Sequence, residues 1–282
     1  MNYNAFKAAY INTLANKYGT EEALALFYVA FEHFTQSQRS RFLSMQELQP
    51  DESVQEEFES VLKGLQLGQP IQYLIGEAHF YGLTFKVNPS VLIPRPETEE
   101  LVDLVIKTVK KSGNRCATLL DIGTGSGCIA ISLKLHLPKT EVFGLDTSSA
   151  ALVTARLNAE ANNAEVYFIE ADILTYEQDN KYDVIVSNPP YIRELEKAGM
   201  HEQVLSHEPH LALFVTNEEP LIFYKAIARF AKNQLNQDGQ LFFEINEYLG
   251  QETVAMLHEA GFSSVQLLKD MQGKDRMIYA RK

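Results

Sequence analysis

The sequence predicts an α/β fold in which a mostly parallel sheet is covered by helices on both faces, preceded by a small helical bundle. From about residue 117 onward, buried strand-like runs alternate with helical runs, the pattern typical of a parallel sheet. Before residue 75, apolar residues recur with the helical period. Glycines and prolines separate the two regions. We therefore expect a helical domain at 1–75, a β-hairpin linker at 76–93 and an α/β domain at 94–282.

The N-terminal region shows apolar stripes at helical spacing. The first stripe is Phe6, Tyr10, Ile11 and Leu14, and the second is Leu24, Phe27, Phe31 and Phe34. Gly19 is expected to end the first helix, with Thr20 as the N-cap of the second. A third helical segment begins near Asp51. Helices of this kind bury their stripes against one another, so these aromatic residues are interpreted as core.

The C-terminal region contains seven strand-like runs. They are ATLLDIG, TEVFGLD, EVYFIEAD, YDVIVSN, GQLFFEIN, SSVQLLKD and DRMIYARK, and the last two are expected to pair antiparallel. Alternating positions around Gly82 predict the hairpin of the linker. Pro96 suits the first turn of a helix, where the following glutamates complement its positive end. The pattern predicts a Rossmann-like sheet of seven strands.

Composition excludes several classes of protein. The net charge of -12 argues against a duplex nucleic-acid binder, although an acidic protein can carry a local basic groove. Cys116 and Cys128 cannot form a disulfide framework or a four-ligand zinc site. His201, His207 and His210 lack a recognised zinc spacing even with Glu208 nearby, so no metal is expected. With neither a signal-peptide pattern nor an apolar run of about 20 residues, the chain is expected to be cytoplasmic, without membrane contact.

A glycine-rich loop follows the first predicted strand of the α/β domain. It comprises Asp121, Ile122, Gly123, Thr124, Gly125, Ser126 and Gly127. Alternate glycines allow a tight turn and a close approach of a ligand, outside the carboxyl end of a strand where open α/β sheets bind ligands. Asp146 follows the next strand and can accept hydrogen bonds from both ribose hydroxyls. The unit predicts an adenosine-type ligand.

The spacing of this loop favours a cationic nucleotide. A dehydrogenase would present GxGxxG and bind pyrophosphate, whereas this loop reads GxGxG with Asp121 ahead of it. A carboxylate there would repel pyrophosphate and favour the amino group or sulfonium of S-adenosylmethionine. Asp172 could bond the adenine amino group, with Ile173 packing on the ring; the alternative is that Asp172 caps a turn. A glycine-rich connection without a ligand is the alternative for the whole loop.

The tetrapeptide Asn188-Pro189-Pro190-Tyr191 follows the strand YDVIVS. Two prolines stiffen the backbone and remove two donors, so the corner offers acceptors only. If Asn188 Oδ1 and the Pro189 carbonyl each accept one N–H of a planar NH2 group, they hold its nitrogen for methyl transfer and stabilise the growing positive charge. Tyr191 would stack on the planar group or wall off its pocket. The alternative is a Pro-Pro turn with Asn188 as an Asx-turn residue.

The chain resembles the release factor glutamine methyltransferases, the HemK/PrmC family. The resemblance spans residues 68–245. It is carried by GQPIQYLIG at 68–76, FYGLTFKV at 80–87, VLIPRPETE at 91–99, the loop from Asp121 to Gly127, Asp146, SNPPYI at 187–192, and Glu208-Pro209 with Ala212-Leu213. Two positions depart from the family pattern: Pro220-Leu221 stands where Gly-Leu is usual, and Ile173 where an aromatic residue is usual. The second departure concerns adenine stacking.

The resemblance implies a specific activity. Members of the family transfer a methyl group from S-adenosylmethionine, leaving S-adenosylhomocysteine, to the glutamine side-chain nitrogen of the GGQ motif in bacterial class 1 release factors. The N-terminal helical domain helps bind the factor. Carried over, Gly123 to Gly127 and Asp146 hold the cofactor, and Asn188 to Tyr191 hold the glutamine. Asn188 is also expected to contact the cofactor. We expect the chain to act as a monomer.

Two other functions fit the same residues. The acceptor corner would also suit adenine N6 or guanine N2 of a flipped-out base. The net charge and the absence of an appended basic or aromatic-rich segment count against that interpretation. A cofactor-binding protein without catalysis is the third possibility, and turnover distinguishes it from an enzyme.

Overall fold

The computed structural model describes residues 1–113 and 116–282, which divide into two compact units. One unit comprises Met1–Glu77 with His201–His207, and the other comprises Ala78–Met200 with Glu208–Lys282. Each has its own buried apolar core, so each is described by itself. In the described residues, no helix is long and apolar enough to cross a membrane.

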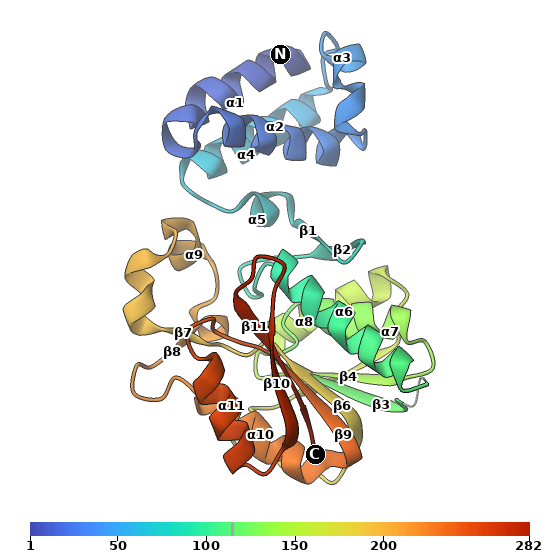
Figure 1. The fold of residues 1–282 in the computed structure, drawn as a ribbon. Coiled ribbons are helices and arrows are strands. Elements are labelled where there is room, and N and C mark those ends of the chain that lie inside the picture. Colours follow the sequence, from blue (N-terminus) through green and yellow to red (C-terminus); the bar gives the residue numbers. More distant parts are fainter. Residues whose placement is uncertain (114–115) are drawn as a thin grey trace. The chain divides into compact units, whose positions relative to one another are not determined.

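The first unit is helical, as predicted (Figure 1). Its elements are α1 (Tyr3–Tyr18), α2 (Thr20–Thr35), the 3-10 turn η1 (Arg39–Arg41), α3 (Phe42–Met45), α4 (Glu52–Gln66), α5 (Ile71–Ile75) and α9 (Glu202–His207). Phe27 and Phe58 lie at the centre of an aromatic core, and the Tyr10 hydroxyl donates to the Phe58 carbonyl at 2.8 Å. A buried hydroxyl with a partner avoids the cost of desolvating an unpaired polar group.

Two details of the helical prediction were wrong. Gly19, at φ +84°, ends α1 and also serves as the N-cap of α2, so Thr20 is already the first helical residue. One residue joins the two helices, which leaves Thr20 no extended position from which to cap. Ile11 and Leu24 are only half-buried, whereas Tyr3 and Leu26 point into the core.

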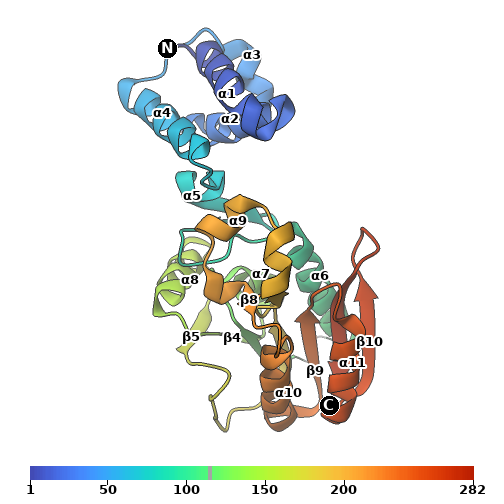
Figure 2. The same ribbon diagram turned by 90° about the vertical axis from the view of Figure 1, so that its left-hand side faces the viewer.

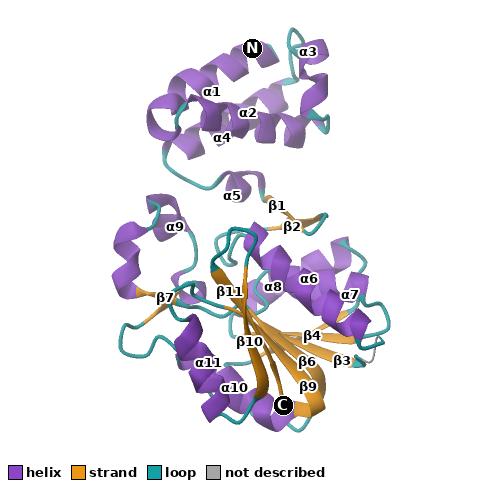
Figure 3. Ribbon diagram, viewed as in Figure 1, coloured by secondary structure: helices purple, strands orange, loops and turns teal. Residues whose placement is uncertain are grey.

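The second unit contains a seven-stranded sheet among the described residues, which confirms the predicted fold class (Figure 3). The strand order is β10-β11-β9-β6-β3-β4-β5, and β11 runs antiparallel to both of its neighbours. The sheet strands are β3 (Thr118–Ile122), β4 (Glu141–Asp146), β5 (Val166–Glu170), β6 (Tyr182–Ser187), β9 (Leu235–Glu244), β10 (Ser263–Lys269) and β11 (Asp275–Arg281). The expected antiparallel pair at the end of the chain is present as β10 and β11.

Helices cover both faces of this sheet (Figures 1 and 2). One core cluster packs α6 (Pro96–Lys111), α7 (Cys128–His136) and α8 (Ser149–Ala161) on one face. The other cluster packs α10 (Ile222–Gln234) and α11 (Gly250–Glu259) on the opposite face. Neighbouring strand residues alternate between the clusters, because successive side chains of a strand point to opposite faces. Neither α10 nor α11 was among the helices predicted from the sequence.

Smaller elements surround the sheet. The hairpin predicted around Gly82 is formed by β1 (Glu77–Phe80) and β2 (Leu83–Lys86). After β6 come β7 (Ile192–Arg193), η2 (Glu194–Gly199), η3 (His210–Ala212) and β8 (Phe214–Val215). β7 pairs with β8 in parallel, which closes the segment between them into a loop whose two ends lie together.

The order of the strands brings three loops to one edge. β3 lies between β4 and β6, and all three run parallel. Ile122 at the end of β3 pairs with Leu145 on one side and with Ser187 on the other. The strand order reverses at β3, and such a switch point is where open α/β sheets bind ligands.

Candidate active site

The glycine loop leaves β3 and enters α7 in a conformation that glycine alone adopts readily. Gly123, Gly125 and Gly127 have φ values of +74°, +54° and +82°. A Cβ on Gly127 would also lie 2.9 Å from Ile131 Cδ1 and 3.3 Å from Ala155 Cβ, because α7 and α8 pack closely there. The backbone N–H of Gly123 donates to the Leu145 carbonyl at 2.8 Å, which fixes the loop to the end of β4. The loop is therefore shaped by its backbone.

Asn158 ties the hairpin to this loop from below. Its side chain is fully buried and donates to the carbonyls of Ser126 and Lys86, at 2.9 and 3.0 Å. It also accepts from the backbone N–H of Lys86 at 2.6 Å. One amide therefore connects α8, β2 and the glycine loop, so the hairpin supports the loop from within the same unit.

Asp121 lies fully buried beneath the loop. Its Oδ2 accepts a hydrogen bond from the Thr124 hydroxyl at 2.6 Å, and Oδ1 has no partner among the described residues. Burial raises the pKa of Asp121 to about 7, with the Thr124 hydrogen bond opposing the shift. A buried carboxylate oxygen without a partner is costly, and a cation brought to the loop would relieve that cost.

The carboxylates of Asp146 and Asp172 both lie at the edge of the same pocket. Asp146 accepts from the backbone N–H groups of Gly125 and Ser148, at 2.8 and 2.9 Å, and burial raises its pKa. Asp172 accepts from the Leu174 N–H at 2.9 Å. The turn-capping alternative for Asp172 is thus present in the structure, together with its position beside the pocket.

A pocket opens where the three loops meet. Its lining combines glycine-loop, carboxylate and apolar residues: Ile122, Gly123, Leu145, Asp146, Thr147, Ala171, Asp172, Ile173, Leu174, Ser187, Pro189, Pro190, Leu211, Phe223 and Ile227. Apolar side chains with a few polar groups are typical of small-molecule sites. The structure therefore brings Gly123, Asp146, Asp172 and Ile173 together with the prolines of the tetrapeptide. Asp121, Thr124 and Ser126 are buried and are not among the residues that line this pocket.

The tetrapeptide after β6 lies against the glycine loop. A Cβ on Gly123 would lie 3.9 Å from the Asn188 carbonyl oxygen. Asn188 Nδ2 donates to the Thr98 hydroxyl at 3.2 Å, and the Tyr191 hydroxyl donates to Glu244 at 2.9 Å. Burial and the nearby Glu244 carboxylate raise the pKa of Tyr191 well above its usual value. Tyr191 is therefore a neutral wall rather than a base at neutral pH.

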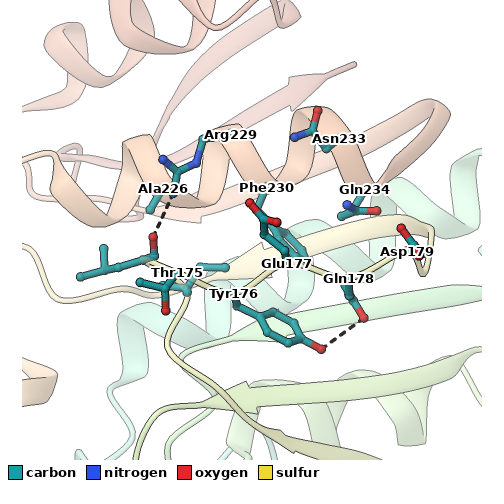
Figure 4. Close-up of a pocket in the computed structure, with 12 residues that line it drawn as sticks. Thr175, Tyr176, Glu177, Gln178, Asp179, Ala226, Arg229, Phe230, Asn233 and Gln234 are labelled. Carbon is teal, nitrogen blue, oxygen red and sulfur yellow. Dashed lines mark hydrogen bonds between the residues drawn. The ribbon is translucent and has the colours of Figure 1, made fainter.

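A second hollow adjoins the first and is lined differently (Figure 4). It lies between residues 173–179 and α10, and its volume is about 630 Å³ against about 200 Å³ for the pocket at the strand ends. Arg229 crosses it to donate to the Leu174 carbonyl at 2.9 Å. The hollow contains neither the glycine loop nor the tetrapeptide, so its size does not make it the reactive site.

Comparison with known proteins agrees with this geometry. The PrmC N-terminal domain family matches residues 8–76, and the methyltransferase small domain family matches residues 98–212. A release factor glutamine methyltransferase of Flavobacterium psychrophilum is 46% identical over 97% of this chain and 96% of its own length. One of Enterococcus faecalis is 38% identical over 92% of each chain.

The chain belongs to the release factor glutamine methyltransferase family. The likeness covers both units, since the match to the Flavobacterium psychrophilum protein leaves little of either chain unaligned. This confirms the family resemblance carried by the motifs of the sequence.

Solved structures agree on the fold alone. A methyltransferase of Pyrococcus furiosus has a TM-score of 0.53 at 20% identity and covers 72% of this chain and 90% of its own. A 16S rRNA methyltransferase of T. thermophilus, solved with AdoMet and guanosine, also has a TM-score of 0.53, at 22% identity, covering 73% of this chain and 49% of its own. Both support the assignment of this release factor methyltransferase family member to the Rossmann-like methyltransferase fold.

The residues at the strand ends fit the S-adenosylmethionine that a methyltransferase of this family uses. The unpartnered Oδ1 of Asp121 suits a ligand that carries positive charge. Gly123 and Gly125 leave the loop open to close approach, with no atom within 4 Å of a Cβ on Gly125. Apolar walls from Ile173, Phe223 and others suit a flat ring.

Several residues of this site were not among those predicted from the sequence. Leu211 and Phe223 line the pocket, and Phe223 supplies the aromatic ring that Ile173 lacks. Thr98 and Glu244 are buried hydrogen-bond partners of the tetrapeptide. Glu244 gave a usable signal, since a carboxylate follows the apolar run Leu241-Phe242-Phe243 at the end of a strand that runs parallel to β6.

In the segment with His201, His207 and His210, Glu208 forms an ion pair with Arg95. Glu208 is buried; it pairs with Arg95 and accepts from the Ile93 N–H at 3.4 Å. That contact fixes one end of the segment to the loop ahead of α6. Among the described residues, no group of three or more His, Cys, Asp or Glu could hold a metal ion.

Proposed function

We propose that the chain methylates the side-chain amide nitrogen of the glutamine in the GGQ motif of bacterial class 1 release factors. The observation that carries this proposal is the acceptor-rich tetrapeptide beside the glycine-loop pocket, in a chain 46% identical to a release factor glutamine methyltransferase over nearly its whole length. S-adenosylmethionine, when bound, supplies an electrophilic methyl group on a sulfonium.

The cofactor would be held by groups of the loops after β3, β4 and β5. We assign the backbone of Gly123, Thr124, Gly125, Ser126 and Gly127 to the loop that surrounds it, and Asp121 to its positive charge. Asp146 would accept from the ribose hydroxyls, although its oxygens already receive the N–H groups of Gly125 and Ser148. Asp172 would accept from the adenine amino group, with Ile173 and Phe223 against the ring.

The substrate amide would be held by acceptors of the tetrapeptide. Asn188 Nδ2 is already engaged by Thr98, which leaves Asn188 Oδ1 available to accept one N–H. The Pro189 carbonyl would accept the other. Two acceptors fix the plane of the amide and present its nitrogen to the cofactor pocket, and orientation of this kind contributes about 7–11 kcal/mol in well-placed reactions.

These acceptors also favour the reacting state. An amide nitrogen that gains a substituent acquires positive charge, which polarises its two N–H bonds and strengthens their hydrogen bonds to Asn188 and Pro189. No strong base is needed beforehand, because the proton becomes acidic as that charge develops and can leave to water. Pro190 stiffens the corner, and Tyr191 closes it with a neutral ring held by Glu244.

We propose different roles for the parts of the chain. Residues 1–75 would bind the release factor, residues 76–93 would link the domains, and residues 94–282 would carry out methyl transfer. A match of residues 8–76 to the PrmC N-terminal domain family supports the first assignment. We infer that the protein acts in the cytoplasm, since its proposed substrate is a translation factor. We also propose that it acts as a monomer. A net charge of -12 supports the inference that it holds no nucleic acid stably.

The decisive test offers two kinds of substrate at once. The chain is incubated with isotopically labelled cofactor, a bacterial class 1 release factor and tRNA, and the products are analysed by mass spectrometry. We expect one methyl group on the glutamine of the GGQ peptide and none on RNA. Label in RNA alone would replace the proposal with methylation of an exocyclic amine on a base. No label in either would leave a binding protein without catalysis.

A further inference from the structure

Glu244 is a buried carboxylate that contacts Tyr191 of the tetrapeptide directly and is connected to Asn188 through Thr98. It ends β9, and only 2% of its surface is exposed. Its Oε2 accepts from the Thr98 hydroxyl at 2.7 Å, and its Oε1 accepts from the Tyr191 hydroxyl at 2.9 Å. Removing a carboxylate from water is costly, so a buried one at a reactive site points to a task beyond packing.

Groups from several elements determine the charge of Glu244. Burial raises its pKa, whereas the hydroxyls of Thr98 and Tyr191 and the guanidinium of Arg276 lower it, and Glu97 raises it. Arg276 itself pairs with Asp270 at 3.1 Å. Two hydroxyl donors directed at the two oxygens match the acceptor-only character of an ionised carboxylate.

The hydroxyl of Thr98 connects Glu244 to Asn188 by two hydrogen bonds. A hydroxyl has one proton, and Thr98 gives it to Glu244. Its oxygen is then left as an acceptor towards Asn188, 3.2 Å away, so the Asn188 atom that faces it must be the donor Nδ2. The Oδ1 of Asn188 consequently lies on the edge of the amide group away from Thr98, where the corner needs an acceptor.

We propose that Glu244 is a positioning residue that fixes the orientation of the Asn188 side-chain amide through Thr98. This inference rests on the proposed function. Without the carboxylate, the Thr98 hydroxyl could donate to Asn188 Oδ1 instead. The Asn188 amide would then turn over and present its NH2 to the substrate. The NH2 of Asn188 and the NH2 of the glutamine are both donors, so no hydrogen bond could form between them. Glu244 thus determines whether the corner selects an amide.

The inference predicts a change in chemical selectivity as well as in rate. A corner of two acceptors favours the NH2 of glutamine and repels the carboxylate of glutamate. If the amide of Asn188 can turn over, its NH2 can donate to a carboxylate instead, and the preference for glutamine over glutamate becomes smaller. A purely structural role would weaken the binding of both ligands alike.

The experiment uses four variants of the full chain. Thr98→Val removes the relay, Thr98→Ser keeps the hydroxyl, and Glu244→Met keeps the length of the side chain but has no oxygen to accept from Thr98. Thr253→Val is the matched control, because Thr253 is also buried and its hydroxyl donates to the Leu249 carbonyl at the start of α11. Thermal unfolding shows which variants are folded, and Glu244→Met serves as the test if Thr98→Val is not.

Two readouts are measured. The first is turnover of the release factor. The second is calorimetric binding, to the enzyme saturated with S-adenosylhomocysteine, of the release factor and of its form with glutamate in place of the GGQ glutamine. We expect the wild type to prefer glutamine by about 5–150-fold, since a buried polar group left without a partner costs about 1–3 kcal/mol. In Thr98→Val and Glu244→Met we expect the ratio to fall to within about threefold and turnover to fall about 10–100-fold.

The conservative variants complete the test. Thr98→Ser should restore both the binding ratio and most of the turnover, and Thr253→Val should change neither. A folded Thr98→Val or Glu244→Met that keeps the wild-type ratio would overturn the inference, as would a Thr98→Ser that behaves like Thr98→Val. A wild type that methylates glutamine while the variants keep its selectivity refutes this inference alone. A wild type that neither binds nor methylates the release factor refutes the proposed function as well.

Discussion

The glycine loop and the tetrapeptide corner lie side by side at one edge of the sheet, but they are constructed differently. The loop is held by backbone hydrogen bonds within a few residues and by glycines whose φ values are positive. The corner depends on the Thr98 hydroxyl of α6, which accepts from Asn188, and on the Glu244 carboxylate at the end of β9, which accepts from Tyr191 and Thr98. Substitutions in the loop should therefore weaken cofactor binding, whereas substitutions in the corner should slow turnover with the cofactor still bound.

Asn188→Ala should separate the two regions most clearly. Losing one preorganised polar contact in a reactive site lowers turnover by about 10²–10³-fold. Cofactor affinity should stay within about twofold, since no loop contact changes and twofold is only about 0.4 kcal/mol. Turnover is measured with labelled cofactor and affinity by calorimetry. Asn233→Ala, in the hollow of Figure 4, is the control and should change neither quantity. Normal turnover in Asn188→Ala would remove Asn188 from the mechanism.

The pH dependence of stability tests the loop through Asp121. The native state keeps the Asp121 proton up to about pH 7, whereas the unfolded chain releases it near pH 4. Because the native state binds the extra proton in this range, the free energy of unfolding should fall as pH rises from about 4 to about 7 and then level off. The fall attributable to Asp121 is at most about 4 kcal/mol.

Urea unfolding at several pH values measures this slope. Asp146 and Glu244 also have raised pKa values, so the relevant quantity is the difference between the wild type and Asp121→Asn, whose slope should be shallower. Bound cofactor should favour the ionised Asp121, so in the wild type only, affinity should strengthen as pH rises towards about 7 and then level off. Identical slopes in the two proteins would mean that Asp121 is not protonated in the native state.

Gly127→Ala should weaken the loop without touching the corner. Positive φ and the contact with Ile131 together cost about 1–3 kcal/mol. We expect cofactor affinity to fall about tenfold, while turnover at saturating cofactor changes little, because the strain acts on binding. Gly19 has a similar φ but open space where a Cβ would lie. Gly19→Ala should therefore lower the free energy of unfolding only by the cost of the positive φ, about 1 kcal/mol. Equal affinity in Gly127→Ala and the wild type would contradict a tightly shaped loop.

Asp172 gives the smallest and most discriminating effect. Asp172→Asn keeps an oxygen that can accept from the Leu174 N–H, whereas Asp172→Ala loses it. If Asp172 bonds the cofactor, Asp172→Asn should lower cofactor affinity about threefold. Asp172→Ala should lower it further and should also lower the free energy of unfolding by about 1 kcal/mol. Calorimetry and thermal unfolding measure the two quantities. Unchanged affinity in Asp172→Asn would leave this carboxylate with its turn alone.

The same contrast explains what could be predicted from the sequence. The order of strands, the glycine loop and Asn188-Pro189-Pro190-Tyr191 are written in adjacent residues, so local periodicity and spacing were sufficient. Thr98 and Glu244 lie 146 positions apart and meet only because β9 pairs with β6 and α6 packs beside β9. No local pattern records that meeting.

Other misses follow from the same physics. Leu211 and Phe223 look like ordinary core residues, because lining a pocket and filling a core require the same apolar side chain. Thr20 was taken for a cap because its residue type is typical of one, but a single glycine joins α1 to α2. Residue type gives the preference, and the length of the connection decides which residue occupies the position.

The central claim is that Asn188 Oδ1 and the Pro189 carbonyl hold the two hydrogens of a glutamine amide beside the cofactor pocket. A crystal structure of the chain with S-adenosylhomocysteine and a release factor tests it most directly. We predict both oxygens within about 3.2 Å of the glutamine amide nitrogen, the distance of a normal N–H to O hydrogen bond. A complex in which the amide nitrogen contacts neither oxygen, with residues 188–191 facing away from the cofactor, would contradict the account.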